Sequence, residues 1–179
     1  ILFGMPIAQI MLFGFAITNE INNANIAILD QSKDAETQKI INTINASKYF
    51  DSMQEISHES EIENVFKKGK VKAVLVFEKD FIKNLETKKQ AKVQVITDAT
   101  DPNIANTITN YVNAILQNYT QQLNQEESTA YFIQTQTQLY YNPELKSVFN
   151  FVPGVMTVIL MLVSAMMTSI SITREKELG

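Results

Sequence analysis

The feature that most constrains this chain is a long segment without charge near its C-terminal end. No Asp, Glu, Lys or Arg occurs between Ser147 and Thr173, and four charges then follow directly in 174–177. A helix needs about 20 residues to cross the ~30 Å hydrocarbon core of a bilayer, and buried helices of soluble proteins are seldom uncharged for so long. We therefore predict a transmembrane helix at 151–173 that leaves the membrane at Arg174; the alternative is a buried helix of a soluble protein.

A second uncharged segment, Ile1 to Asn19, opens the sequence. It has no initiator Met and no basic start, so it does not resemble a signal peptide. We interpret it as the end of a first transmembrane helix whose beginning is missing. Because Gly4, Pro6 and Gln9 make it a poorer helix than the second, a kinked or re-entrant segment is the alternative.

These two segments divide the chain into four predicted parts. They are the end of a first transmembrane helix at 1–19, an extracytoplasmic domain at 20–146, a second transmembrane helix at 147–173, and the start of a cytoplasmic segment at 174–179. The orientation rests on Arg174 and Lys176, because the cytoplasmic flanks of membrane helices are rich in Lys and Arg. We therefore expect residues 20–146 to lie outside the cytoplasm.

The middle segment alternates between short strand-like runs and amphipathic helical periods. Strands are predicted at 25–30, 49–56, 71–77, 91–97 and 130–141. Helices are predicted after a cap at Ser32 or Asp34, after a cap at Ser57 with a stop at Gly69, around 79–85, and after a cap at Asp101.

This alternation predicts an α/β fold, in which helices pack on a mixed, partly parallel sheet of about five strands. The sheet domain would be flanked by the two transmembrane helices, the first of them truncated. The run at 130–141 alternates with period two through its Gln and Thr residues, which indicates a strand near an edge of the sheet.

Acidic residues at strand ends form the candidate ligand site. Asp30 and Asp98 each follow a predicted strand, with Asp101 close behind, and ligands of open α/β sheets collect outside the carboxyl ends of strands. These carboxylates could hold a cation or a sugar. The alternative is structural, because Asp opens turns and caps helices: Asp30 and Asp98 would open turns, while Asp34 and Asp101 would cap helices.

The sequence contains no motif for catalysis or for a cofactor. It has no Cys, a single His at His58 and five widely separated Gly, which excludes a thiolate metal site and a glycine-rich phosphate loop. No G-x-S-x-G nucleophile elbow occurs either. The net charge of −4 argues against a nucleic-acid partner. We expect neither an enzyme nor a bound cofactor in this chain.

Several short motifs occur in an order that is similar to a known family. After an apolar segment ending in N-E, they are I-A-I-L-D (26–30), V-F-K-K-G (65–69), A-V-L-V-F-E-K-D-F (73–81), T-D-A-T-D-P-N-I-A-N (97–106), N-P-E-L (142–145), F-V-P-G (151–154) and S-I-T-R-E-K-E-L-G (171–179). Over essentially the whole chain they resemble the permease subunit of bacterial ABC-2 type exporters that carry a large extracytoplasmic domain between their first two membrane helices. Glu78, where Pro is common, and Ala99, where Gly is common, depart from the pattern within loops.

The resemblance implies a place in the bacterial inner membrane, among its lipids, and a set of partners. Such permeases pair as dimers, bind a separate cytoplasmic subunit that binds ATP, and export drugs, lipids or polysaccharide-like compounds. By the same resemblance, Arg174, Glu175, Lys176 and Glu177 would begin the segment that contacts the ATPase. The outer domain would meet substrate or a periplasmic adaptor protein. The alternative is a two-helix membrane receptor whose outer domain senses a ligand, since it has the same order of helix, domain and helix.

Overall fold

The computed structural model of the 179-residue chain describes residues 24–126, 130–146 and 148–178. The chain divides into two compact units, Ile1–Pro143 and Glu144–Gly179. The first apolar segment, predicted at 1–19 as the end of a membrane helix, lies outside the described residues.

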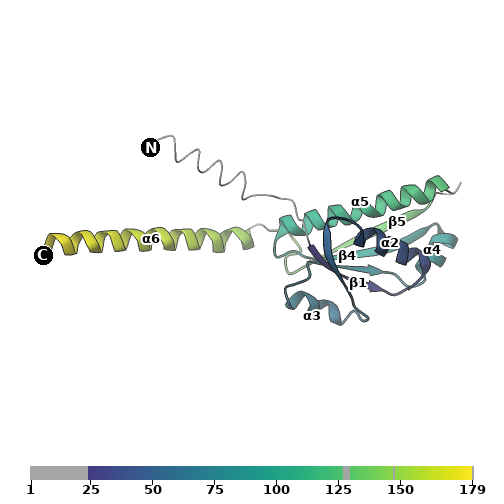
Figure 1. Cartoon of the computed structure of the whole chain (residues 1–179), viewed down its shortest axis with the longest axis horizontal. Coiled ribbons are helices and arrows are strands. Elements are labelled where there is room, and N and C mark those ends of the chain that lie inside the picture. The colour runs from purple at the N-terminus through teal and green to yellow at the C-terminus, as the bar shows by residue number, and fades with distance from the viewer. Residues whose placement is uncertain (1–23, 127–129, 147, 179) are drawn as a thin grey trace. The chain divides into compact units, whose positions relative to one another are not determined.

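The first unit alternates strands and helices along the chain (Figure 1). Its strands are β1 (Ala24–Asp30), β2 (Phe50–Glu55), β3 (Ala73–Phe77), β4 (Gln90–Asp98) and β5 (Phe132–Tyr140). Its helices are α2 (Ala35–Asn45), α3 (Glu61–Lys67), α4 (Phe81–Lys88) and α5 (Pro102–Glu126). Each strand and helix predicted between residues 25 and 141 is therefore present.

The five strands form one mixed sheet in the order β2-β1-β3-β4-β5. β1 is parallel to both β2 and β3, β4 is antiparallel to β3, and β5 is parallel to β4. The predicted mixed, partly parallel sheet is confirmed, and so is the place of β5 at an edge. β1 and β4 therefore run in opposite directions, so their carboxyl ends lie at opposite ends of the strands. This separates the acidic residues of the candidate site that follow these two strands.

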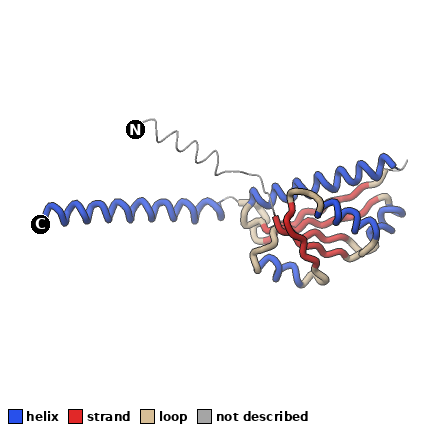
Figure 2. Tube along the Cα trace, viewed as in Figure 1, coloured by secondary structure: helices blue, strands red, loops and turns tan. Residues whose placement is uncertain are grey.

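Helices cover both faces of this sheet, as Figure 2 shows. One face packs against α2, α4 and α5 through a cluster that includes Ile44, Leu85 and Leu116. The other face packs against α3 through residues such as Phe66. All of β3 is buried between the two layers, as its unbroken apolar run predicted, and each fully buried Leu or Val side chain stabilises the fold by about 1.5–3 kcal/mol.

The beginnings of two helices differ from the prediction. α3 begins at Glu61 and not after Ser57, because the Glu61 carboxylate accepts hydrogen bonds from the backbone N–H groups of Ser57 and His58 and holds them in a turn. α4 begins at Phe81, since Asp80 has the left-handed φ of 57° and cannot continue a helix. The stop of α3 is as predicted: Gly69 has a φ of 70°, which glycine adopts without steric cost.

The second unit contains one long helix, α6 (Val148–Leu178), of 31 residues. It starts three residues before the apolar stretch 151–173 and one residue after the predicted boundary at 147, so Pro153 lies inside the helix and not in its first turn. Pro lacks an N–H group, so the carbonyl of residue 149 loses its helical partner near this end. The helix also continues past Arg174 without a break at the charged residues.

Candidate functional site

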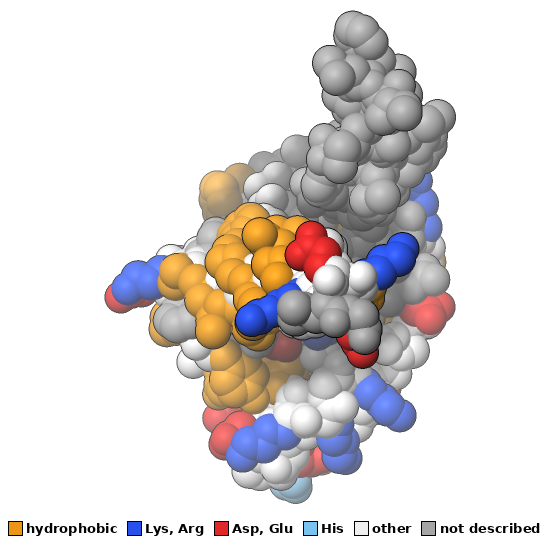
Figure 3. All heavy atoms as spheres, turned by 90° about the vertical axis from the view of Figure 1, so that its left-hand side faces the viewer, with side chains coloured by type: hydrophobic (Ala, Val, Ile, Leu, Met, Phe, Trp, Pro, Cys, Tyr) orange, Lys and Arg blue, Asp and Glu red, His pale blue; other side chains and the backbone are white. Residues whose placement is uncertain are grey.

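The α6 helix is apolar on all its sides. Its residues 151–177 are long and apolar enough to cross a membrane, and among the described residues none of its most apolar part is buried. Figure 3, which looks onto the end of α6, shows a group of apolar side chains beside the charged ones at this end. At about 1.5 Å per residue, the 27 residues span about 40 Å, which exceeds the ~30 Å of a hydrocarbon core.

Several polar side chains within α6 are satisfied by the helix itself. The hydroxyls of Thr157, Thr168 and Thr173 donate to the carbonyl oxygens of the residues four positions earlier, at 2.9, 2.8 and 2.8 Å. In lipid, where no water is available, an unsatisfied hydroxyl would cost several kcal/mol. These internal bonds allow threonines to lie in a membrane helix.

The charged residues Arg174, Glu175, Lys176 and Glu177 occupy the last turns of α6 and are exposed. Successive residues of an α-helix point about 100° apart, so the four charges surround the helix axis. Such a ring cannot enter hydrocarbon and marks one end of the span. Contact between these residues and an ATPase stays a prediction.

The candidate ligand residues of the α/β unit are not brought together. Asp30 is the last residue of β1 and pairs with Phe77 at one end of the strands. Asp98 is the last residue of β4 and pairs with Tyr140 at the opposite end of the strands, near Asp101 at the start of α5. A single site containing all three is therefore wrong, and the reason is the antiparallel pairing of β3 with β4.

At each edge the carboxylate has a structural partner. Asp30 accepts hydrogen bonds from the backbone of Ser32 and Lys33, at 3.0 and 2.8 Å. Asp98 accepts one from the backbone N–H of Thr100 at 3.0 Å, and it lies 3.7 Å from the Lys72 ammonium group.

Asp34 and Asp101 hold the first turns of helices. Asp34 accepts from the backbone N–H of Thr37 at 2.8 Å, at the start of α2. Asp101 accepts from the backbone N–H of Asn103 at 2.9 Å, at the start of α5. The structural alternative, in which Asp30 and Asp98 open turns while Asp34 and Asp101 cap helices, is confirmed.

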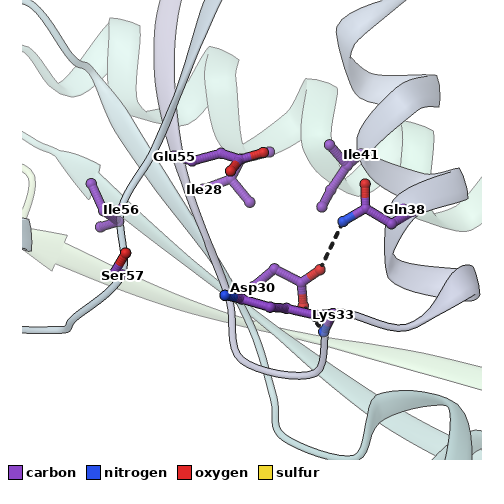
Figure 4. Close-up of a pocket in the computed structure, with 8 residues that line it drawn as sticks. All are labelled: Ile28, Asp30, Lys33, Gln38, Ile41, Glu55, Ile56 and Ser57. Carbon is purple, nitrogen blue, oxygen red and sulfur yellow. Dashed lines mark hydrogen bonds between the residues drawn. The ribbon is translucent and has the colours of Figure 1, made fainter.

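Asp30 nevertheless borders a pocket at the carboxyl edge of β1 and β2 (Figure 4). Its volume is about 190 Å³, and its lining comes from β1, β2, the turn before α2, and α2 itself. The lining residues are Ile28, Asp30, Lys33, Gln38, Ile41, Glu55, Ile56 and Ser57. The three isoleucines are buried and form an apolar floor, whereas Lys33 and Glu55 are exposed at the mouth.

The chemistry of this pocket follows from which groups are already engaged. Besides its two turn bonds, Asp30 accepts from the Thr37 hydroxyl at 2.7 Å and from the Gln38 amide at 3.3 Å. Four donors therefore hold the carboxylate in place, so Asp30 is a wall of the pocket more than a ligand. In the described part of the chain, no group of three or more His, Cys, Asp or Glu side chains could hold a metal ion.

The size of the pocket also limits what it could receive. Drug-sized ligands occupy pockets of about 300–1,000 Å³, so a cavity of about 190 Å³ suits a small group or one side chain. Of its lining, sequence reasoning identified Asp30 alone. Glu55 could have been found only from the parallel pairing of β2 with β1, which places both strand ends at one edge.

A second group of hydrogen bonds, near the carboxyl end of β1, connects the start of α2 to the start of α4. The other carboxylate oxygen of Asp34 accepts from the Ser32 hydroxyl at 2.6 Å and from the backbone N–H of Ile82, in α4, at 2.9 Å. The Ser32 hydroxyl in turn accepts from the backbone N–H of Phe81 at 2.9 Å. Asp34 therefore caps α2 and, together with Ser32, also caps α4.

The electrostatics of Asp34 follow from these contacts. Partial burial by itself raises the pKa of the Asp34 carboxyl, but hydrogen bonds from Ser32 and from the backbone of Thr37, Ile82 and Glu36 outweigh that effect. The net result is a pKa below the ordinary value of 3.8. Asp34 is thus a structural carboxylate that stabilises the fold in its ionised form.

Comparison with known proteins covers the entire sequence. All of residues 1–179 match the model of a family described as "ABC-2 family transporter protein". Two relatives from Escherichia coli K12 are the "Probable multidrug ABC transporter permease YbhS", 28% identical over 98% of this chain, and the "Probable multidrug ABC transporter permease YbhR", 29% identical over 96%. The aligned parts are 47% and 46% of those proteins, so the chain spans about half the length of the curated relatives it matches.

A solved structure is also similar. A "domain of a putative ABC type-2 transporter from Thermotoga maritima MSB8" aligns with a TM-score of 0.48 and 19% identity, over 64% of this chain and 86% of that one. The names of the sequence relatives agree with the predicted family. They also agree with the expectation that the chain is not an enzyme, since both relatives are called permeases.

Proposed function

Since the chain belongs to the ABC-2 family of transporter proteins, we propose that it is part of the membrane permease of an exporter. In this proposal α6 spans the bacterial inner membrane and the α/β unit lies outside the cytoplasm. A separate cytoplasmic subunit binds ATP and drives transport. The observation that carries the proposal is the match of all 179 residues to a transporter family. That match is also why the two-helix receptor is not retained.

The helix end at 174–177 is, in this proposal, the beginning of the contact with the ATPase. The charges lie directly after a span of membrane length, where a cytoplasmic protein can reach them. The two bases also fit the enrichment of Lys and Arg on cytoplasmic flanks.

The orientation can be tested with single cysteines, because residues 1–179 contain none. Gln117→Cys, at an exposed position of α5, should react with a membrane-impermeant maleimide added to spheroplasts. Glu177→Cys should react only after the membrane is opened, and Leu160→Cys, inside the span, should resist under both conditions. Labelling of Glu177→Cys in sealed spheroplasts would reject the proposed orientation.

The coupling role needs the full-length permease expressed with its ATP-binding subunit. The double variant Arg174→Glu/Lys176→Glu should lower the amount of co-purified ATPase about tenfold, since loss of two charge pairs worth about 0.5–1 kcal/mol each gives a factor of that order. The control Arg174→Lys/Lys176→Arg keeps the charges and should bind normally. Equal recovery of the ATPase with both double variants would contradict the coupling role.

The pocket beside Asp30 is where the outer unit meets a partner. Its volume favours a side chain of a periplasmic adaptor or a small part of the exported compound over a whole drug-sized molecule. Ser57→Trp, at the mouth, should fill the pocket and reduce export in cells without reducing co-purification of the ATPase. The control Gln117→Trp, at an exposed position of α5, should leave export unchanged, and unchanged export with Ser57→Trp would remove the pocket from the proposal.

A further inference from the structure

β5 has a free edge. It pairs with β4 on one side, and no strand in the described ranges pairs with its other side. The backbone N–H of Phe132 donates to Lys89, and the carbonyl of Tyr140 accepts from Ala99, so the even-numbered residues of β5 bond towards β4. Because bonding directions alternate along a strand, the N–H and C=O groups of the odd-numbered residues point outward.

This edge lacks the features that normally prevent strands from pairing. β5 has nine residues without charge or proline, and its pairing with β4 runs without a bulge from Phe132 to Tyr140. The other edge strand, β2, has six residues, carries Asp51 and Glu55, and has an irregular register with β1. Short strands, charges and bulges protect a sheet edge. β2 is therefore protected, whereas β5 is open to another strand.

The sequence of β5 indicates which strand that is. F-I-Q-T-Q-T-Q-L-Y reads the same in both directions by residue class: aromatic, aliphatic, Gln, Thr, Gln, Thr, Gln, aliphatic, aromatic. A two-fold axis pairs a strand with its own reverse. We propose that β5 pairs antiparallel with β5 of a second copy of this chain, with Gln136 on the two-fold axis, so that two five-stranded sheets become one continuous sheet.

The bonding direction of β5 agrees with that register. Centring on Gln136 places Thr135 opposite Thr137 of the second copy and Ile133 opposite its Leu139. These are the outward-pointing residues, so each such pair can exchange both of its backbone hydrogen bonds. A register shifted by one residue along one strand would pair outward-pointing groups with groups already bonded to β4. The backbone therefore requires odd-numbered residues to pair with odd-numbered ones, and among these registers the side-chain symmetry selects the one centred on Gln136.

The side chains are matched as well. On the face opposite α5, Phe132 would pack against Tyr140 of the second copy, and Gln134 would lie opposite Gln138. Phe132 is 63% exposed in the single chain, so this contact would cover an aromatic ring. Gln134 and Gln138 are already fixed by hydrogen bonds from Gln90 and Gln94, at 2.8 and 2.6 Å, and their own amide N–H groups remain as donors. Aromatic pairs and Thr–Thr pairs across strands each add stability.

Single cysteines test this register directly, using the 179-residue chain in detergent. Gln136 would face itself in a non-hydrogen-bonded pair with Cα atoms about 4.5 Å apart, within the range of a disulfide. Gln136→Cys should therefore form a disulfide dimer under mild oxidation. The matched control Gln134→Cys should cross-link more than about tenfold slower, because the two copies of residue 134 would be about 14 Å apart. When Gln134→Cys and Gln138→Cys are mixed, they should cross-link to each other although neither does so alone.

A second variant separates this contact from any association between membrane helices. Gln136→Glu would place two carboxylates opposite each other on the axis, so cross-linking between Gln134→Cys and Gln138→Cys should be lost in the Gln136→Glu background while tyrosine fluorescence still reports a folded α/β unit. Equal cross-linking of Gln136→Cys and Gln134→Cys would overturn the proposal. Unchanged cross-linking between Gln134→Cys and Gln138→Cys in the Gln136→Glu background would overturn it too, and neither result depends on whether the chain belongs to an exporter.

Discussion

The α/β unit and α6 use the same apolar residue types in opposite ways. In the α/β unit they lie inside, so Leu75 in β3 is 0% exposed. In α6 they lie outside, and Leu160 is 64% exposed. The first arrangement removes apolar surface from water by packing protein on protein, and the second requires lipid to do it. The α/β unit is therefore stable in water, whereas α6 needs a lipid environment. The same substitution should have different effects in the two regions.

The largest expected effect comes from shortening a leucine in each region. Leu75→Ala should lower the free energy of unfolding of the α/β unit by about 2–5 kcal/mol, because it leaves a cavity in a packed core. Leu160→Ala should not change that free energy. Guanidinium unfolding followed by tyrosine fluorescence isolates the α/β unit, since all six tyrosines lie between Tyr49 and Tyr141. Equal destabilisation by the two variants would mean that the stabilities of the two units are coupled.

A charge placed in α6 should show the opposite selectivity. Leu160→Lys should oppose membrane integration by about 2.5–3.5 kcal/mol, the cost of Lys at the centre of a spanning helix. The fraction of chains that resist carbonate extraction measures integration, and Leu160→Met is the matched control that keeps the position apolar. The same Lys variant should leave tyrosine-detected unfolding unchanged. Full integration of Leu160→Lys would show that α6 does not place residue 160 in hydrocarbon.

Most of the fold could be predicted from the sequence because its signals are local. The unbroken apolar run at 71–77 predicts a strand covered on both faces, and the uncharged run at 151–173 predicts a helix of membrane length. The direction of β4 could not be predicted, since a connection as short as α4 carries no local signal for a parallel or antiparallel return. That one direction separates Asp30 from Asp98 and removes the predicted joint site.

The start of α4 was missed for a related reason. Its first N–H groups, those of Phe81 and Ile82, are capped by Ser32 and Asp34, which lie 49 and 48 residues earlier in the sequence. No local pattern around residue 80 contains that information. The pocket beside Asp30 was likewise found only in part, because Glu55 and Ser57 reach it through the pairing of β2 with β1.

The smallest expected effect is the contribution of Asp34 to the pH dependence of the stability of the α/β unit. Hydrogen bonds keep the folded pKa of Asp34 below the unfolded value of 3.8, so its ionised form stabilises the fold above that value. This stability is lost as the pH falls through the folded pKa. Asp34→Asn cannot titrate, so the α/β unit of this variant should lose less stability than wild type between about pH 5 and pH 3. At neutral pH, removal of the cap by Asp34→Ala should cost about 1–2 kcal/mol.

The contrast with α6 supplies the control for that experiment. The threonines of α6 donate to carbonyls of their own helix and do not titrate. Membrane integration of α6, measured by resistance to carbonate extraction after incubation at about pH 5 or about pH 3, should therefore be the same for wild type and Asp34→Asn. Glu63→Gln is the matched surface control, because Glu63 lies exposed at the surface beside Lys67 and water screens the pair. Equal reductions of the acid dependence of the unfolding free energy by Asp34→Asn and Glu63→Gln would contradict this prediction. The hydrogen bonds from Asp34 to the starts of α2 and α4 would then contribute no measurable stability.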